Sequence, residues 1–544
     1  MRLYVEGAAD MRLWMRVLMF AAAVTLVLCA QRAPTVNGEA PLIGGPYARL
    51  LAHATDLGPD RGGHVQLVVA LGDVARPQDL ISWAAHRELT VQWAPGQDWA
   101  IIDGGADKVA DAFGVAVHNY RTGDGHVFYA AARQPGVPSS LRGQVTDVGR
   151  ILGYGRRRVA KPPIIPLDVP DPGLTPTLMV TAYDVTPLAA TGKGQTIAFY
   201  EWGGYDTTDL DAYATHFKLP PFNIAPPIGG MPPPGDASGE TMMDLEAAHA
   251  VAPDARLVVV NANTYFPGNN FAWSQVASMF AAVDHQYPGV VWSSSIGIAP
   301  CDQMIKGVDA QPAESALETA ESHGTSAFDA SGDTGGLECK EDLQGQWGTK
   351  PSPQDIGLDS IASLPAMTDV GGTTLSTDSN GVWLSEETWV DYPMQQGTGG
   401  GVSAIYNRPD WQSRLSVAKD SGNPLHRLTP DVAAVADPDT GMVVRADHSW
   451  DIVGGTSLAA PLWAGFAAVI NEYLTANGGH QLGNLDPLLY QAAASGAEPA
   501  FHDVSLGGNN VDTAGPGYDL VTGLGTPDVA TLAHDILDIQ KAGR

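Results

Sequence analysis

The chain has 544 residues, of which 44% are hydrophobic, and it carries a formal net charge of −30. This length allows two or three domains with a globular composition. So much negative charge would repel nucleic acid and anionic lipid, which argues against both as partners. The high counts of Gly (62) and Pro (40) favour a loop-rich protein over a helical bundle.

The N-terminus has the pattern of an export signal. Arg12 and Arg16 precede the apolar run "VLMFAAAVTLVLCA", residues 17–30. A basic segment followed by an apolar segment of this length is typical of a signal peptide, and the run is short for a transmembrane span. We expect residues 1–35 to be a signal peptide or an N-terminal anchor, and the protein to be secreted.

The next segment, 36–155, has the pattern of a small α/β domain. Gly-Asp-Gly between two β-rich arms is a hairpin signal, and apolar residues at helical spacing follow Pro77. The patterns predict a strand at 64–73, helices at 77–89 and 107–115, a hairpin at 118–131 and a capped helix at 137–153.

The composition changes at 156–178, "RRRVAKPPIIPLDVPDPGLTPTL", which has a basic start and six prolines. Such a segment is expected to be extended and exposed. We interpret it as a linker and as a plausible region for cleavage.

From 179 to 544 short apolar runs alternate with helix-like stretches. Continuous apolar strands between helices predict a mainly parallel central sheet that helices cover on both faces. Functional sites in such sheets form at the carboxyl ends of the strands. The predicted strands lie at 195–204, 255–263, 289–297, 326–333 and 366–375, and the predicted helices at 239–252, 271–286 and 314–324.

Cysteines are few. Once a signal peptide removes Cys29, only Cys301 and Cys339 remain. In an exported chain they form either one disulfide or two buried thiols. The sequence has neither a CxxC motif nor clustered His and Cys, which argues against a zinc site.

"VGGTSLAAPLWAG", residues 453–465, presents Ser457 before a small-residue helix, as a serine-peptidase nucleophile is often presented. Such a serine needs a base. His323 in "SHGTSAF" is one candidate, but it ends a predicted helix, where the helix dipole favours a histidine without any catalytic role.

Carboxyl groups are the other candidates for the base. Glu240 and Asp244 are four residues apart at the start of a predicted helix, so they share one face. They could be a solvated acidic first turn, but two carboxylates held close in partial burial share protons, and the raised pKa suits a general base in acid. Asp333 in "FDASGDTGG" follows a predicted strand, where a plain turn aspartate is also common.

Taken in order, these motifs resemble the sedolisins, the serine-carboxyl peptidases, whose fold is like that of subtilisin. The resemblance begins near residue 63 and continues to the end of the chain. It implies a subtilisin-like catalytic domain preceded by a small α/β, ferredoxin-like activation prodomain, with 156–178 as the segment cut in maturation. The motifs that carry it are "GETMMDLEAAHAVAPDA", "ASGDTGG", "GTGGGVSAIYNRPDWQ", "PDVAAVADPDTG", "GGTSLAAPLWAG" and "GYDLVTGLGTPD".

The resemblance implies a role for each candidate. Ser457 would be the nucleophile, Glu240 its general base, and Asp244 a hydrogen-bond partner of Glu240. Asp333 would line the oxyanion hole, where only a protonated carboxyl can donate to the developing charge. A free Asp titrates near ~3.9, so such a site should work in acid and fail at neutral pH.

Glu201 resembles a glutamate that extends the carboxyl network in some sedolisins. Ile296 stands where those members have a tryptophan, which puts the extended network in doubt and leaves Glu201 as a strand-end charge. Ser295 and Gly297 are expected to border the substrate cleft. The glycine loop 398–403 could pair with an extended peptide.

The C-terminal stretch suggests a metal. Asp503 is followed by a G-x-G-x-D pattern, and two carboxylates with carbonyls from glycine-rich loops suit Ca²⁺, although an ordinary turn is the alternative. The resemblance implies one structural Ca²⁺ ion. Its ligands would be Asp503, Asp519 and the carbonyls of Val504, Gly515 and Gly517.

The leading hypothesis is therefore an exported acid endopeptidase, made as an autoactivating proenzyme. We expect peptide or protein substrates, intramolecular inhibition by the prodomain and a monomeric state. The alternatives are a tripeptidyl-peptidase of the same family, a subtilisin-like enzyme with a histidine base, and a binding module without activity on the same fold.

Overall fold

The computed structural model describes residues 40–155, 173–235, 237–342, 352–391, 396–413, 415, 425–495 and 499–543. The expected signal or anchor segment 1–35 and most of the expected linker, 156–172, lie outside these residues. Within the described part of the chain, none of the helices combines the length and the apolar character that crossing a membrane requires.

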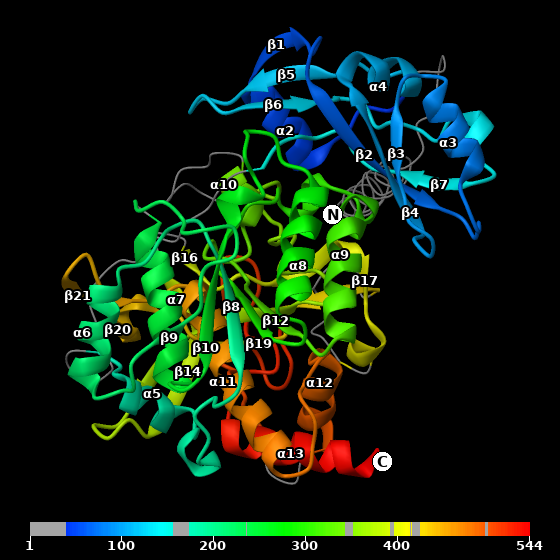
Figure 1. Cartoon of the computed structure of the whole chain (residues 1–544). Helices are drawn as coiled ribbons and strands as arrows, with labels where there is room; N and C mark the ends of the chain where they lie inside the picture. Colours follow the sequence, from blue (N-terminus) through cyan, green and yellow to red (C-terminus); the bar gives the residue numbers. More distant parts are fainter. Residues whose placement is uncertain are drawn as a thin grey trace, which may run out of the picture. The chain divides into compact units, whose positions relative to one another are not determined.

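The N-terminal unit contains a four-stranded antiparallel sheet in the order β3-β4-β2-β7 (Figure 1). With its two helices the chain order is β-α-β-β-α-β, which is the ferredoxin-like arrangement expected from the sequence. Its elements are β2 (His64–Leu71), α3 (Gln78–Ala85), β3 (Thr90–Gln92), β4 (Trp99–Gly105), α4 (Ala106–Phe113) and β7 (Val145–Val148).

A second, three-stranded sheet of this unit has the order β1-β5-β6. The strands β5 and β6 pair antiparallel, as the hairpin signal at 118–131 predicts. The elements here are α2 (Gly45–His53), β1 (Thr55–Pro59), β5 (His118–Arg121) and β6 (Val127–Ala130).

The predicted capped helix at 137–153 is wrong. Only the short 3-10 helix Ser139–Leu141 forms there, and the chain then enters β7. Pairing with β2 places Val148 opposite Val69 and buries Val145 and Val148. Tertiary pairing thus outweighs the local pattern, and β-branched residues suit a half-buried strand.

The larger, C-terminal region is built on an eight-stranded sheet in the order β14-β13-β12-β11-β8-β10-β9, with β19 paired to β13. All pairs are parallel except β13 with the edge strand β14, which confirms the expected mainly parallel sheet. The strands are β8 (Thr196–Glu201), β9 (Asn223–Ile224), β10 (Arg256–Asn261), β11 (Val291–Ser294), β12 (Ser326–Ala330), β13 (Thr368–Thr377), β14 (Trp383–Thr388) and β19 (Val432–Val435).

Helices cover both faces of this sheet (Figure 1). Alternate residues of β8 point to different apolar clusters: Phe199 packs with residues of α7 and α11, and Tyr200 with residues of α8 and α9. The helices are α5 (Pro176–Ala182), α6 (Thr207–Phe217), α7 (Ser238–Val251), α8 (Trp273–Gln286), α9 (Gly307–Ser322), α10 (Glu338–Asp342), α11 (Thr456–Ala476), α12 (Asp486–Ser495) and α13 (Val529–Ala542).

Short two-stranded pairings complete the region. The hairpin β20–β21 comes directly before α11 and therefore leads the chain to Ser457. The remaining strands are β15 (Val390–Asp391), β16 (Gln396–Gly397), β17 (Gly401–Asn407), β18 (His426–Thr429), β20 (Met442–Ala446), β21 (Ser449–Val453), β22 (Phe501–His502) and β23 (Thr526–Pro527).

The last residues of the expected linker are part of the packed structure. Leu174 is fully buried, and its N–H donates to the carbonyl of Gly441 at 3.0 Å. Helix α5 begins at Pro176, and the side chain of Thr175 caps it by accepting from Leu178 N–H. This segment lies against the β20–β21 hairpin: Leu174 forms a bridge with Met442, and a Cβ atom at Gly173 would lie 3.1 Å from Ile452.

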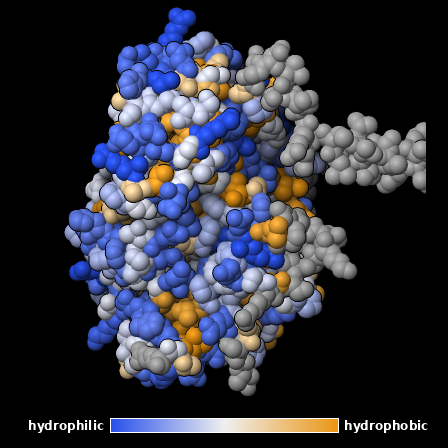
Figure 2. All heavy atoms as spheres, turned by 90° about the vertical axis from the view of Figure 1, so that its right-hand side faces the viewer, coloured by the Kyte–Doolittle hydropathy of each residue, from blue (hydrophilic) through white to orange (hydrophobic). Residues whose placement is uncertain are grey.

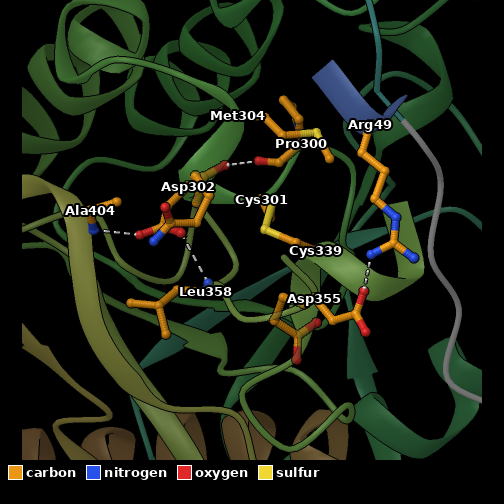
Figure 3. Close-up of a disulfide and its surroundings, with 12 residues drawn as sticks. Arg49, Pro300, Cys301, Asp302, Met304, Cys339, Asp355, Leu358 and Ala404 are labelled. Carbon is orange, nitrogen blue, oxygen red and sulfur yellow. Dashed lines mark hydrogen bonds and ion pairs between the residues drawn. A yellow bond between two sulfur atoms is a disulfide. The ribbon is translucent and has the colours of Figure 1, made fainter. Parts of the chain in front are cut away.

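Cys301 and Cys339 form a disulfide with a Cα–Cα distance of 5.2 Å (Figure 3). It joins the loop after β11 to the start of α10. Next to it, Asp302 accepts the N–H groups of Ala404 and Leu358 at 2.7 and 3.1 Å. The structure thus decides between the two readings of the cysteines in favour of a bond that tethers a loop at a strand end.

The face drawn in Figure 2 is mainly hydrophilic, with several separate hydrophobic patches. Large exposed hydrophobic side chains occur in separate parts of the sequence, among them Met231, Leu384 and Leu506. Scattered apolar residues of this kind are normal on a soluble surface and indicate no interface by themselves.

Candidate active site

Ser457 lies in the first turn of α11, at a point where the chain turns sharply. Gly455, which precedes the helix, has φ 94°, a left-handed conformation that favours glycine. The helix behind it is buried along most of its length and packs on strands of the central sheet and on α7. Ser457 stands at the start of α11, but the buried helix behind it fixes its position in the protein core.

Glu240 and Asp244 occupy the first turns of α7, and both side chains are buried. Helices α7 and α11 pack closely because position 465 on α11 is glycine. A Cβ atom at Gly465 would lie 2.8 Å from Cβ of Val251 on α7. This close approach brings the carboxyl groups of α7 to the start of α11.

The serine hydroxyl faces the Glu240 carboxyl. Burial raises the pKa of Glu240 well above its usual value, the carboxyl of Asp244 raises it further, and the nearby Ser457 hydroxyl lowers it. Glu240 Oε1 has no donor in bonding geometry among the described residues. Catalytic groups often tighten only when substrate binds.

Asp244 connects Glu240 to a third carboxyl group. Burial raises the pKa of Asp244 well above its usual value, the charge of Glu201 raises it further, and the nearby Ser295 hydroxyl lowers it. Burial likewise raises the pKa of Glu201 to about 8. Glu201 ends strand β8 and is fully buried, so it is not a solvated strand-end charge.

Thr241, between the two acids of α7, holds Glu201 in place. Its hydroxyl lies 3.0 Å from Glu201 Oε2 and 2.9 Å from the carbonyl of Gly203. Ile296, which cast doubt on a network through an aromatic side chain, is buried in the apolar cluster of α8 and α9. Asp244 and Glu201 nevertheless affect each other's pKa.

Asp333 follows β12 and reaches the residue before Ser457. Its Oδ1 accepts the main-chain N–H of Thr456 at 2.8 Å and the Thr456 hydroxyl at 2.9 Å. Its charge also raises the pKa of Glu240. The structure therefore brings together all four residues that the sequence singled out: Glu240, Asp244, Asp333 and Ser457.

Sequence reasoning missed the hydroxyl groups around this site. Ser295 was expected at a cleft, but its hydroxyl also donates to the Ser457 carbonyl at 3.2 Å. Thr241 and Thr456 were not singled out, although each directly follows or precedes a candidate residue. Their places next to Glu240 and Ser457 were the only feature of the sequence that could have pointed to these two threonines.

The histidine considered as a base is engaged elsewhere. His323 caps the C-terminus of α9, and its Nδ1 lies 2.8 Å from Asp284. On α7 itself, His249 stacks on Phe222 and contacts the carbonyl of Pro220 through Nε2. Burial lowers the pKa of His249 to about 4.

The expected calcium ligands come from two segments that meet. Asp503 Oδ2 accepts the N–H of Gly517, and Asp519 Oδ2 accepts the N–H of Gly515, both at 3.0 Å. Burial raises the pKa of Asp519, and hydrogen bonds from the N–H groups of Thr522, Gly515 and Val521 lower it. Two carboxylates against one glycine loop, with the carbonyl of buried Val504 near Thr522, provide the oxygen donors that Ca²⁺ prefers.

A buried serine at the start of a central helix, faced by carboxyl groups over a parallel sheet, is the arrangement of a serine peptidase with a subtilisin-like fold and a carboxyl group in place of histidine. Comparison with known proteins agrees with this class. Residues 75–151 match the family "Pro-kumamolisin, activation domain". The chain is 30% identical to kumamolisin of Bacillus sp. (strain MN-32) over 535 residues, which cover 93% of this chain and 90% of kumamolisin.

Two further comparisons extend the match. Tripeptidyl-peptidase 1 of Mus musculus is 25% identical over 441 residues, which cover 74% of this chain and 72% of that protein. The structure of Pseudomonas sedolisin, a serine-carboxyl proteinase complexed with pseudo-iodotyrostatin, aligns with a TM-score of 0.57 and 27% identity, over 68% of this chain and 99% of sedolisin. The chain belongs to the sedolisin family of serine-carboxyl peptidases and carries the activation prodomain of that family.

Proposed function

We propose that this protein hydrolyses peptide bonds in acid with Ser457 as nucleophile and Glu240 as general base. Asp244 stabilises the proton on Glu240, and Asp333 donates to the oxyanion. The observation that carries the proposal is the buried Ser457 hydroxyl facing a buried carboxyl pair, where a subtilisin-like enzyme has histidine.

The steps follow from these positions. Glu240 takes the proton from Ser457 as Oγ attacks the carbonyl carbon of the scissile bond. The tetrahedral intermediate places its oxyanion near the N-terminus of α11, where first-turn N–H groups lack helical acceptors and the helix dipole favours negative charge. Glu240 then protonates the leaving amine, and water hydrolyses the acyl-enzyme with the same proton transfers in reverse.

Acid is required because Asp333 can donate to the oxyanion only as COOH. The raised pKa values of the buried carboxyl pair make Glu240 a stronger base in the form of the pair in which it is ionised. The groups thus suit a reaction below neutral pH.

We also propose domain limits and a location. Residues 36–155 form the inhibitory prodomain, 1–35 direct export, and maturation cuts the proline-rich segment before Gly173, because Leu174 is already buried in the catalytic unit. N-terminal sequencing of the mature chain after acid incubation should give a first residue between 156 and 173. A first residue after Leu174 would contradict this boundary.

One structural Ca²⁺ ion at the C-terminal loop completes the proposal. Asp503, Asp519 and the carbonyls of Val504, Gly515 and Gly517 would hold it. The ion would stabilise the loop and has no step in the reaction.

The test compares wild type with Ser457→Ala after incubation near pH ~4, well below the neutral range where His-based enzymes work. An acid-denatured protein serves as the substrate. Wild type should degrade it and the variant should not. Equal activity of the two proteins, or equal wild-type activity at neutral pH, would contradict the proposal.

Exopeptidase action is the second candidate, since the chain also resembles tripeptidyl-peptidase 1. An enzyme of that kind must bind the free amino end of its substrate. Mass spectrometry of products from amino-acetylated and free peptides distinguishes the two modes, because only an endopeptidase should cleave the blocked peptides.

A further inference from the structure

The Cys301–Cys339 disulfide is buried, and the apolar side chains that share its cluster come from the N-terminal unit. Both cysteines are 0% exposed. Together with Met304 they belong to an apolar cluster whose other buried members all lie between residues 43 and 154, among them Tyr47 and Leu50 of α2. The apolar cover of this cluster is therefore supplied by the proposed prodomain, residues 36–155.

The prodomain also holds the loop on the Cys301 side. The Arg150 guanidinium donates to the carbonyl of Met304, in the 3-10 helix that begins after Cys301, and it lies 5.3 Å over the ring of Tyr47. The main-chain N–H of Arg150 donates to Asp309 Oδ1 at 2.9 Å. One prodomain residue thus contacts both the 3-10 helix and the first turn of α9.

A second contact lies on the Cys339 side. Arg49 of α2 donates to Asp355 Oδ1 at 3.0 Å (Figure 3) and to Ser352 Oγ at 2.8 Å. Two residues after Asp355, Gly357 packs directly on the disulfide, since a Cβ atom there would clash with Cys339 Sγ. The segment that Arg49 contacts is therefore supported by the disulfide.

The disulfide connects these two contact regions. It joins Cys301, at the start of the 3-10 helix, to Cys339 in α10, and next to it Asp302 accepts the N–H of Leu358 at 3.1 Å. Without the covalent bond the two regions would share fewer restraints, and the prodomain would have to order them as it binds. A surface that is already ordered binds more tightly, because less conformational entropy is lost.

We propose that the Cys301–Cys339 disulfide is part of the prodomain-binding surface: it fixes the two loops that Arg49 and Arg150 contact, and release of the prodomain uncovers it. The inference rests on the proposed inhibition by the prodomain and assigns part of its binding surface. In the proenzyme the bond is shielded and supports inhibition. In the mature enzyme it is open to reductants.

The first experiment compares the rate at which a water-soluble phosphine opens the bond in the Ser457→Ala proenzyme and in mature wild type, both in mild acid. The phosphine supplies two electrons and becomes its oxide, and each disulfide yields two thiols. Maleimide labels these thiols, and mass spectrometry counts labels on the peptides that contain Cys301 and Cys339. We expect reduction to be at least about 10-fold faster in the mature enzyme, because access of the reductant limits the reaction. Equal rates would overturn the inference.

A matched pair of arginine variants tests the contact within the proenzyme. In the Ser457→Ala background, Arg150→Ala should speed reduction about 3- to 10-fold, because the prodomain loses its hold on the loop. Arg87→Ala is the control, since Arg87 lies over the ring of Trp83 and donates to the Trp83 carbonyl, both within the prodomain. If Arg150→Ala does not fold, Arg49→Ala replaces it. An unchanged rate in the contact variant, or an equal increase in the control, would contradict the proposal.

The double variant Cys301→Ser, Cys339→Ser tests the effect on inhibition. Its proenzyme should mature about 10-fold faster than wild type in acid, while kcat of the mature form stays within about 3-fold. Wild-type maturation kinetics in this variant would overturn the inference. If the double variant does not fold, the reduction rates of the intact bond decide. The rates in the proenzyme variants require no peptidase activity, so an inactive wild type would contradict only the proposed function.

Discussion

The buried carboxyl groups of Glu201 and Asp244 face each other, and each changes the pKa of the other. Glu201 comes from the end of β8 and Asp244 from the second turn of α7. Two carboxylates have no hydrogen between them, so a hydrogen bond forms here only when one is protonated. Burial raises the pKa of both groups, so the pair keeps a proton, and with it this hydrogen bond, well above the pH range in which free carboxyl groups ionise.

Replacement of the proposed base should abolish activity. In Glu240→Gln the amide cannot accept the serine proton, so we expect kcat to fall by at least about 10³-fold. Glu246→Gln is the control, since Glu246 is a buried glutamate of the same helix whose Oε2 accepts the N–H of Arg445. That variant should keep wild-type activity, and equal losses in the two variants would point to damage to α7 instead of to the base.

Stability should decrease as the pH rises from acid to neutral. The folded pKa of Glu201 is raised to about 8, above its unfolded value, so the folded state holds a proton that the unfolded chain releases. Below the unfolded pKa, the full contribution of this proton to the free energy of unfolding is present. It is lost as the pH approaches 8, and the loss amounts to about 3 kcal/mol at pH 7. Thermal unfolding of the Ser457→Ala proenzyme at several pH values measures it, and a melting temperature that rises between pH 5 and 7 would be inconsistent with the buried acids.

Glu201→Gln should separate stability from catalysis. The amide imitates the protonated carboxyl, because it stays neutral, can donate a hydrogen bond and can accept from Thr241. In the Ser457→Ala background we expect a flatter dependence of the melting temperature on pH, and in the active enzyme little change of kcat in acid. A loss of more than about 100-fold in acid would show that Glu201 has to ionise during turnover.

Removal of calcium should destabilise the mature form. At a free Ca²⁺ concentration 100-fold above the dissociation constant, binding contributes about 2.7 kcal/mol, which EDTA should remove. Asp519→Asn should abolish the EDTA effect. Asp378→Asn, in an exposed turn where Asp378 accepts the N–H of Asn380 and Val382, should keep it. A melting temperature that EDTA leaves unchanged would argue against the ion.

Local patterns were sufficient for much of the fold. The apolar runs of β8, β10, β11, β12 and β13 have the character of doubly covered strands, and the structure confirms their parallel pairing. The pattern at 137–153 predicted a helix, whereas the structure has the strand β7 there, which forms by pairing with β2. The interval between Cys301 and Cys339 left their pairing open, since a disulfide depends on the distance between their Cα atoms.

The sequence by itself determined the motifs, their order and the family resemblance, and thereby the candidate acids and serine. Only the tertiary structure decided that Glu201 and Asp244 affect each other, that Thr456 bonds to Asp333, and that Ile296 packs in the apolar cluster of α8 and α9. Sequence patterns report the burial and periodicity of each segment. Distances between segments depend on packing, here of α7 against α11 at Gly465, and a proton relay depends on those distances.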